Sequence, residues 1–152
     1  MWSNMEDIEL ARSLLEEEQL NLVIVKGGQV LFSSSERGVA PFFQAVQSME
    51  EHLHNAAVAD RVVGLAVAML CLHARIASVY AGIVSQGALD MLRGQGMTLT
   101  SENVVPHIFN YDGTDLCPFE KLARNSENPA QLFSTLKSMF GGFNNVGRET
   151  FT

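Results

Sequence analysis

The sequence has little of several features that would point to a function class. It has only two cysteines, Cys71 and Cys117, which lie far apart and do not form a metal-finger spacing, so we expect free thiols. Its 10 Lys and Arg residues are scattered and outnumbered by 17 Asp and Glu residues, which gives a net charge of -7. Phosphate binding needs clustered positive charge, so we expect no nucleic-acid partner.

Long hydrophobic runs are also missing. The central uncharged run, Val62 to Leu72, has about half of the roughly 20 residues that a bilayer-spanning helix needs. The N-terminal stretch, MWSNMEDIELARSLLEEE, is acidic and amphipathic, whereas a secretory signal is basic and then apolar. We therefore expect no membrane partner and a cytoplasmic location.

The composition that is present describes an ordinary globular protein. Of 152 residues, 47% are hydrophobic and 18% are charged, and this length suits one domain with a sizeable core. No linker or repeat divides the chain. We expect a single domain over residues 1–140, followed by a flexible tail over residues 141–152.

The most apolar stretch runs from Ala56 to His73 and has only Asp60 and Arg61 as charges before its closing histidine. A helix that is apolar on every side must be covered on every side, so this stretch predicts a central helix between a sheet and other helices. Asp60 and Arg61 would then lie in its first turn, where the positive end of the helix dipole favours a carboxylate.

Local signals predict the elements before this stretch. Ser3 and Glu6 form a capping-box pattern for a helix from about Asn4 to Gln19. Two runs of β-forming residues separated by Gly27 and Gly28 predict an antiparallel hairpin. The two strands would be Leu20–Lys26 and Gln29–Ser33, followed by a short helix from Pro41 to about Met49 and a loop over Glu50–Asn55.

The second half of the chain predicts alternating strands and helices. Ile76–Ser85 is nearly all apolar, as expected of an interior parallel strand. Ser85 would cap a helix that runs through Leu92, with Gly94 as its stop. Met97–Ser101 is the next strand, Val104–Phe109 an edge strand or loop, Asp112 and Gly113 a turn, Pro118 to about Asn125 a helix, and Asn128 to Phe140 the last helix with its cap.

Cys117 is the first candidate for chemistry. Pro118 suits the first helical position and Glu120 the third, so Cys117 would be the N-cap. Backbone N–H groups and the helix dipole would stabilise its thiolate and make it a nucleophile. The alternative is that its sulfur only caps the helix and packs. Cys71 lies in the most apolar stretch, where a thiol is usually a small core group.

Asp60 is the second candidate, because a carboxylate in an apolar element must reach a cavity, a partner or solvent. The alternative is that it stabilises a helix turn and faces water. Arg61 could pair with it only through a neighbouring element. Ser85, Asp112 and Thr114 belong to a helix start and a turn that follow strands, the region where α/β proteins bind anionic ligands.

Four segments, VADRVVGLAVAML, VYAGIVS, VVPHIFNYDGT and CPFE, resemble in that order the domain-of-unknown-function family numbered 1893, over about residues 5–140. The resemblance implies a fold like that of cytidine deaminases, with three layers, a mixed sheet, an N-terminal antiparallel hairpin and helices on both faces. In that fold the zinc ligands stand at two helix starts. Here those places hold Val58-Ala59-Asp60 and Ser85-Gln86-Gly87-Ala88, and Tyr111 replaces an arginine before Asp112.

This comparison leaves Asp60 in place of a proton-shuttling glutamate, but Val58, Ser85 and Ala88 replace the zinc ligands. We therefore expect no metal, no cofactor and no zinc-dependent deaminase activity. The leading hypothesis is a homodimeric small-molecule-binding domain with a nucleotide-like ligand near Asp60, Arg61, Ser85, Asp112, Thr114, Cys117 and Glu120. The alternative is an enzyme that uses Cys117, with Asp60, as a nucleophile or redox thiol.

Overall fold

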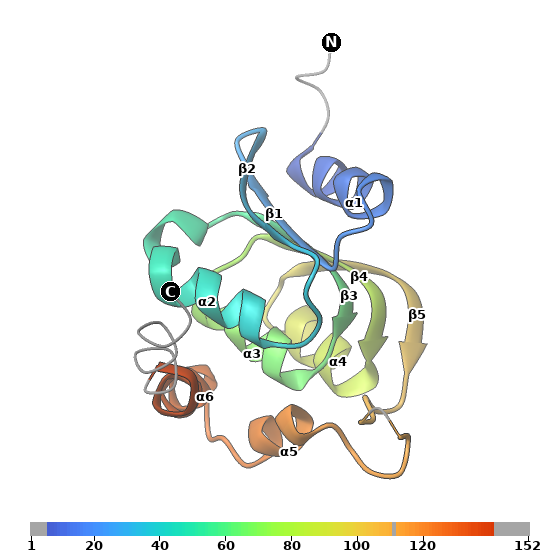
Figure 1. Cartoon of the computed structure of the whole chain (residues 1–152), viewed down its shortest axis with the longest axis vertical. Helices are drawn as coiled ribbons and strands as arrows, with labels where there is room; N and C mark the ends of the chain where they lie inside the picture. The colour runs from blue at the N-terminus through green and yellow to red at the C-terminus, as the bar shows by residue number, and fades with distance from the viewer. Residues whose placement is uncertain (1–5, 111, 142–152) are drawn as a thin grey trace.

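The structure, a computed structural model, describes residues 6–110 and 112–141. Its centre is a five-stranded mixed sheet in the order β2-β1-β3-β4-β5 (Figure 1). β1 pairs antiparallel with β2 and β3, whereas β3, β4 and β5 run parallel. The strands are β1 (Leu22–Lys26), β2 (Gln29–Ser34), β3 (Ala57–Val63), β4 (Ser78–Ser85) and β5 (Thr98–Val105). The predicted α/β class and the N-terminal hairpin are confirmed.

Strand formation follows the local sequence at two places. Gly27 and Gly28 both have positive φ, 60° and 78°, which a two-residue hairpin turn of the primed type requires. β4 pairs with β3 along one edge and with β5 along the other. Near its start, Val79, Tyr80 and Ala81 are buried. The interior parallel strand expected from its apolar run is therefore confirmed.

Helices cover both faces of the sheet. On one face, Ala11 and Leu15 of α1 pack against Val23, Val25 and Ala59. All the other helices contribute to the core on the opposite face. The helices are α1 (Asp7–Glu17), α2 (Ala40–Met49), η2 (Glu50–Leu53), α3 (Leu65–His73), α4 (Gln86–Gly94), α5 (Pro118–Arg124), α6 (Pro129–Leu136) and η3 (Lys137–Gly141).

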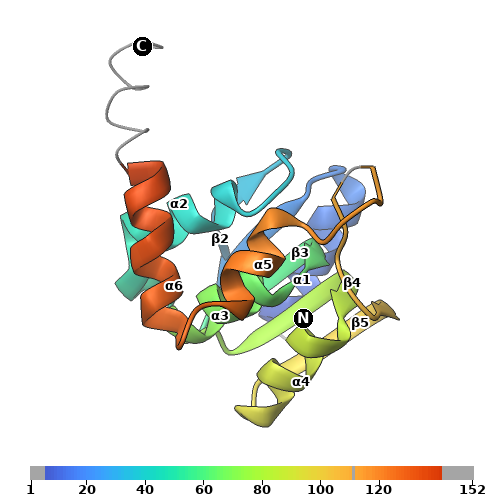
Figure 2. The same cartoon turned by 90° about the horizontal axis from the view of Figure 1, so that it is seen from below.

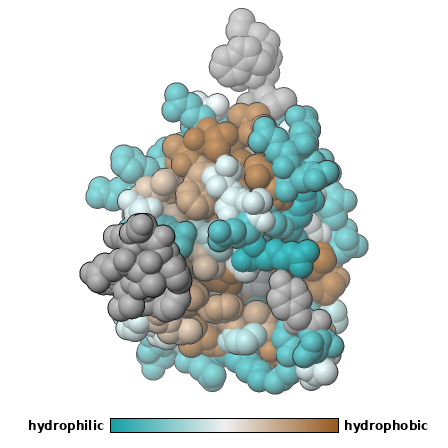
Figure 3. All heavy atoms as spheres, viewed as in Figure 1, coloured by the Kyte–Doolittle hydropathy of each residue, from teal (hydrophilic) through white to brown (hydrophobic). Residues whose placement is uncertain are grey.

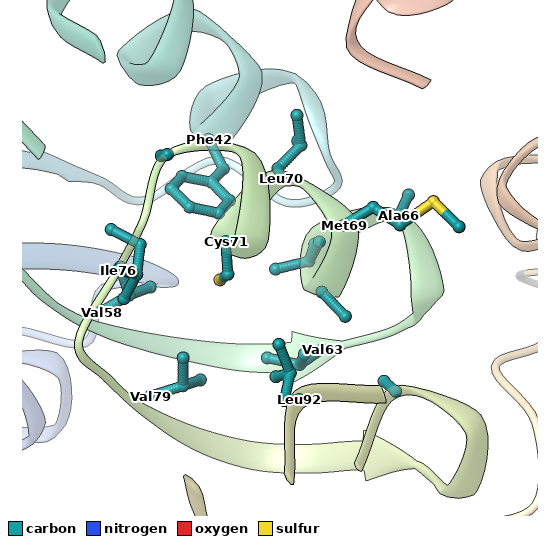
Figure 4. Close-up of a cluster of buried hydrophobic side chains, with 14 of the residues drawn as sticks. Phe42, Val58, Val63, Ala66, Met69, Leu70, Cys71, Ile76, Val79 and Leu92 are labelled. Carbon is teal, nitrogen blue, oxygen red and sulfur yellow. The ribbon is translucent and has the colours of Figure 1, made fainter. Parts of the chain in front are cut away.

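α3 lies between the sheet and the outer helices. It contacts α2, α4, α5 and α6 as well as β3, and Figure 2 shows α5 in front of α3 and α6 beside it. Its side chains from Ala66 to Cys71 are buried, and Figure 4 shows Cys71 on the side of α3 that faces the strand residues Val58 and Val79. The expected sandwiched helix and the three-layer arrangement are both present.

The predicted extent of that helix is wrong in its first half. Ala57–Val63 is strand β3, which pairs with β1 on one side and β4 on the other, and α3 begins only at Leu65. A strand buried on both faces gives the same uninterrupted apolar run as a buried helix, so periodicity does not distinguish them. Asp60 and Arg61 consequently belong to a strand and not to the first turn of a helix.

Two smaller boundaries also differ from the sequence prediction. α1 begins at Asp7, where Glu6 and Glu9 form the capping box in place of the expected Ser3 and Glu6. Ser3 itself and the tail after residue 141 lie outside the described residues. The expected loop after α2 contains the short 3-10 helix η2. The predicted helices that became α2, α4, α5 and α6 are confirmed within a few residues.

Candidate functional site

A cleft of about 930 Å³ opens where the carboxyl end of β3 meets the starts of α3 and α5. The lining of the cleft is mostly apolar. In the view of Figure 1, Figure 3 shows brown, apolar side chains in a hollow near the middle of the molecule, below a belt of teal, polar side chains. The remaining walls come from the β2–α2 loop and from the segment that precedes α5. Ligand sites of open α/β sheets occur at such strand ends.

Asp60 is the most buried acid on the β3 side of the cleft. It lines the cleft but is only 8% exposed, and its Oδ1 accepts a hydrogen bond of 3.2 Å from the backbone N–H of Val62. Burial raises the pKa of Asp60 from 3.8 to about 7, although the backbone N–H groups of Val62 and Arg61 oppose this shift. The carboxyl group can therefore change its charge near neutral pH.

Arg61 also lines the cleft, but its guanidinium group is committed elsewhere. Its Nε donates to the carbonyl of Leu20 at 2.9 Å and its Nη2 to the carbonyl of Leu15 at 2.8 Å. These contacts tie β3 to the C-terminal end of α1 on the other face of the sheet. Arg61 therefore does not neutralise Asp60, its neighbour in sequence.

Glu120 occupies the opposite wall and has a role that the sequence did not indicate. It is 3% exposed, and its Oε1 accepts a hydrogen bond from the backbone N–H of Leu65 at the start of α3. The sequence places Glu120 at the third position of its own helix, α5, but its carboxyl group binds the backbone of α3 instead. A carboxylate at the positive end of the α3 dipole stabilises this contact.

Gly64 makes the contact of Glu120 with α3 sterically feasible. A Cβ atom at Gly64 would overlap Glu120 Oε1 and would lie 3.2 Å from Ile108 Cγ1. The hydrogen bond that caps the start of α3 therefore depends on Glu120 as the acceptor and on a glycine at residue 64. The sequence prediction placed Gly64 inside a helix and gave no sign of this contact, because Leu65 and Glu120 are 55 residues apart.

Cys117 is at the predicted N-cap of α5 and lines the cleft, half-buried. Its side chain makes no cap hydrogen bond, while its backbone N–H donates to the carbonyl of Ile108 at 3.0 Å. Within the described residues, no histidine hydrogen-bonds Cys117; His107 instead contacts Arg124 at 2.9 Å. Among the described residues, the thiol of Cys117 therefore has no histidine as a hydrogen-bonded base.

The other predicted site residues are divided between the cleft and its surroundings. Asp112 lines the cleft, in the predicted turn with Gly113, whose φ is 71°. Thr114 pairs with Asn110 in the same loop but is not part of the lining. Ser85 is buried away from the cleft, where its hydroxyl caps α4 by accepting from Ala88 N–H at 3.3 Å. Tyr111 lies outside the described residues.

Several features bear on chemistry elsewhere in the chain. Cys71 is fully buried, and burial, with a contribution from Asp60, raises its thiol pKa well above 9.0. Over residues 6–110 and 112–141, no group of three or more His, Cys, Asp or Glu side chains is placed to hold a metal ion. In that same part of the chain, no helix combines the length and apolar character needed to cross a membrane.

Comparison with known proteins identifies the family. A family model described as TM1506, Domain of unknown function (DUF1893), matches residues 10–140. The chain belongs to this family. A crystal structure of a DUF1893 family protein (TM1506) from Thermotoga maritima is similar, with a TM-score of 0.80 and 24% identity over 91% of this chain and 95% of that one. No curated protein matches.

Family membership confirms the resemblance seen in the sequence, and the similar crystal structure supports the fold. The expected placement of Val58-Ala59-Asp60 at a helix start is nevertheless wrong, because these residues lie within β3. The helix that follows this strand begins with Gly64 as its N-cap and Leu65 as its first residue. Asp60 reaches the cleft from the strand and not from a helix terminus.

Proposed function

We propose that this protein is a small-molecule-binding domain whose ligand, nucleoside-like in size, occupies the cleft. The observation that carries the proposal is Asp60, a carboxyl group only 8% exposed that lines a mostly apolar cleft. Binding pockets typically measure about 300–1,000 Å³ and combine apolar walls with a few converging polar groups. The cleft, at about 930 Å³, has both properties.

The lining suits a planar nitrogen heterocycle. Val67, Ile108 and Phe119 supply apolar surface against which a ring would pack. Asp60 supplies a hydrogen-bond acceptor for ring N–H or amino groups, at the carboxyl end of a strand. A deaminase-like fold, which we also infer for this chain, would give the same expectation of a nucleobase-like ligand.

Two matched variants test whether the cleft is the binding site. Val62 lines the cleft and is 41% exposed, so Val62→Trp should fill part of the cleft without burying a polar group. Val30 is a strand valine of similar exposure, 47%, that does not line the cleft, so Val30→Trp is the control. Tryptophan is well accepted on strands, so both variants should fold.

The assay is native mass spectrometry of the gently purified protein, followed by calorimetric titration with cytidine and guanosine. The proposal expects a bound small molecule or saturable nucleoside binding in the wild type and in Val30→Trp, and at least about tenfold weaker binding in Val62→Trp, equivalent to 1.4 kcal/mol. Equal affinity in both variants, or no binding in either measurement, would contradict it.

A second candidate function is an enzyme that uses Cys117 as a nucleophile or redox thiol. The observation that favours it is that Cys117 lines the same cleft as Asp60 and makes no side-chain cap contact. The two functions differ in what Cys117→Ser does. An enzyme should lose turnover with this variant, whereas a binding domain should keep its affinity within about threefold.

We infer further that the protein is cytoplasmic and that it forms a homodimer. β2 and β5 are the two edges of the sheet, and unpaired strand edges favour association. The mass in sedimentation velocity at micromolar concentration tests the dimer, and a monomer mass would contradict it.

A further inference from the structure

The cleft has an unequal distribution of charge. Four acids line it, Glu36, Asp60, Asp112 and Glu120, against two basic residues, Arg37 and Arg61. The guanidinium group of Arg61 is bound to backbone carbonyls at the end of α1, which leaves Arg37 in the exposed β2–α2 loop as the other cation. The electrostatic potential in the cleft therefore favours positive ligands over negative ones.

The helix terminus that would otherwise receive an anion is already occupied. The first backbone N–H of α3, at Leu65, donates to the Glu120 carboxylate. A phosphate or carboxylate ligand would have to displace Glu120, which is 3% exposed, or bind beside its negative charge. The protein's own carboxylate thus fills the position at which open α/β sheets commonly bind anions.

Asp60 is the buried acid that remains available. Among the described residues, Asp60 takes part in no ion pair. The four ion pairs found there join Arg12 with Glu16, Arg12 with Glu102, His73 with Glu50, and Lys121 with Asp115. The Asp60 carboxyl group interacts, among the described residues, only with backbone donors, the N–H of Val62, which donates to Oδ1, and the N–H of Arg61. A buried carboxylate gains the most from a partner that brings its own positive charge.

We propose that the cleft takes a ligand with a cationic N–H donor group, such as an amidinium or a protonated nitrogen heterocycle, and that Asp60 is its counter-ion. This inference rests on the proposed function and specifies its ligand class. An amidinium group presents two parallel N–H donors that match the two oxygens of a carboxylate. A neutral amide loses the charge, and a carboxylate or phosphate meets repulsion from Asp60 and Glu120.

The affinity for such a cation should depend on pH through Asp60. The other titratable or charged groups around it are Glu36 and Arg37 from the β2–α2 loop, Arg61 from β3, Asp112, Cys117 and Glu120 from the opposite wall, and Cys71 from α3. The raised pKa of Asp60, about 7, means that its ionised fraction falls steeply in acid. From pH 8 to pH 5 the affinity for a permanent cation should fall roughly 90-fold.

The test uses three probes that share one ring and differ in charge: benzamidine, benzamide and benzoate. Each is titrated into the ¹⁵N-labelled full chain, and the shifts of cleft amides such as those of Val62 and Leu65 report binding there. Asp60→Asn removes the charge with little change of shape. Asp90→Asn is the matched control, because Asp90 is an exposed acid on α4 that does not line the cleft.

The inference expects benzamidine to bind the cleft at least about tenfold more tightly than benzamide at pH 8, equivalent to 1.4 kcal/mol, and benzoate to bind most weakly. Asp60→Asn should abolish both this preference and the pH dependence, and Asp90→Asn should retain them. Cleft binding by benzamide or benzoate as strong as that of benzamidine would overturn the inference but support the proposed function. No cleft shifts with any probe would overturn this inference, whereas the proposed function stands or falls with the nucleoside titration of Val62→Trp and Val30→Trp.

Discussion

Replacing Asp60 by asparagine should make the stability of this protein less dependent on pH. The folded state raises the pKa of Asp60 from 3.8 to about 7, mainly because burial disfavours the charged form. The folded state therefore holds this proton more tightly than the unfolded chain does. The stabilisation is fully present below about pH 3.8 and is lost as the pH rises through about 7.

The magnitude follows from the size of the pKa shift. A shift of one pH unit corresponds to about 1.36 kcal/mol, so the full effect of Asp60 on the free energy of unfolding is of the order of 4 kcal/mol. Because the shift begins to act below pH 5, about 3 kcal/mol of it should develop between pH 5 and pH 8. Asp60→Asn keeps the shape of the side chain and cannot ionise.

The assay is urea denaturation of both proteins between pH 5 and pH 8. Taking the difference between them removes the contributions of all other titrating groups. As the pH rises from 5 to 8, the free energy of unfolding of the variant should increase by about 3 kcal/mol relative to that of the wild type. A difference that stays constant, or that changes in the opposite direction, would refute the assignment of a raised pKa to Asp60.

Two further predictions concern the thiols and Gly64. Iodoacetamide should label Cys117 much faster than Cys71 in the native protein, because Cys71 is fully buried and has a raised pKa; peptide mapping that finds Cys71 labelled first would contradict this. Gly64→Ala should lower the free energy of unfolding by about 1–3 kcal/mol, because the added Cβ atom would overlap Glu120. Gly94 has open space around it, so Gly94→Ala should change the free energy of unfolding by less than about 1 kcal/mol. Equal effects of the two variants in urea denaturation would argue against the Glu120 contact.

The sequence predicted the elements that local signals define. The hairpin depends on Gly27 and Gly28, the α5 start on Pro118, and the α6 cap on Asn128, whose side chain accepts from Gln131 N–H at 2.8 Å. Each signal acts within a few residues, so no knowledge of distant contacts is needed. The same locality explains why Cys117 was correctly placed at a helix N-cap.

The failures concern contacts between distant residues. β3 was read as part of a helix because its two pairing partners, which make Ala57–Val63 a strand, lie elsewhere in the chain. Glu120 suits the third position of α5 in the sequence, but its partner is the backbone N–H of Leu65 at the start of α3, which no local pattern indicates. Arg61, a predicted ligand-binding residue, does line the cleft, but its side chain also binds the carbonyls of Leu15 and Leu20, contacts that no local signal predicts.

The central claim is that the cleft beside Asp60 is a ligand site, and a crystal structure of the protein grown with benzamidine at pH 8 tests it most directly. The account predicts density for the probe in the cleft, with its amidinium group within about 3 Å of the Asp60 carboxylate, and no such density in Asp60→Asn. A well-ordered structure with the probe bound elsewhere and the cleft filled only by water would contradict the account.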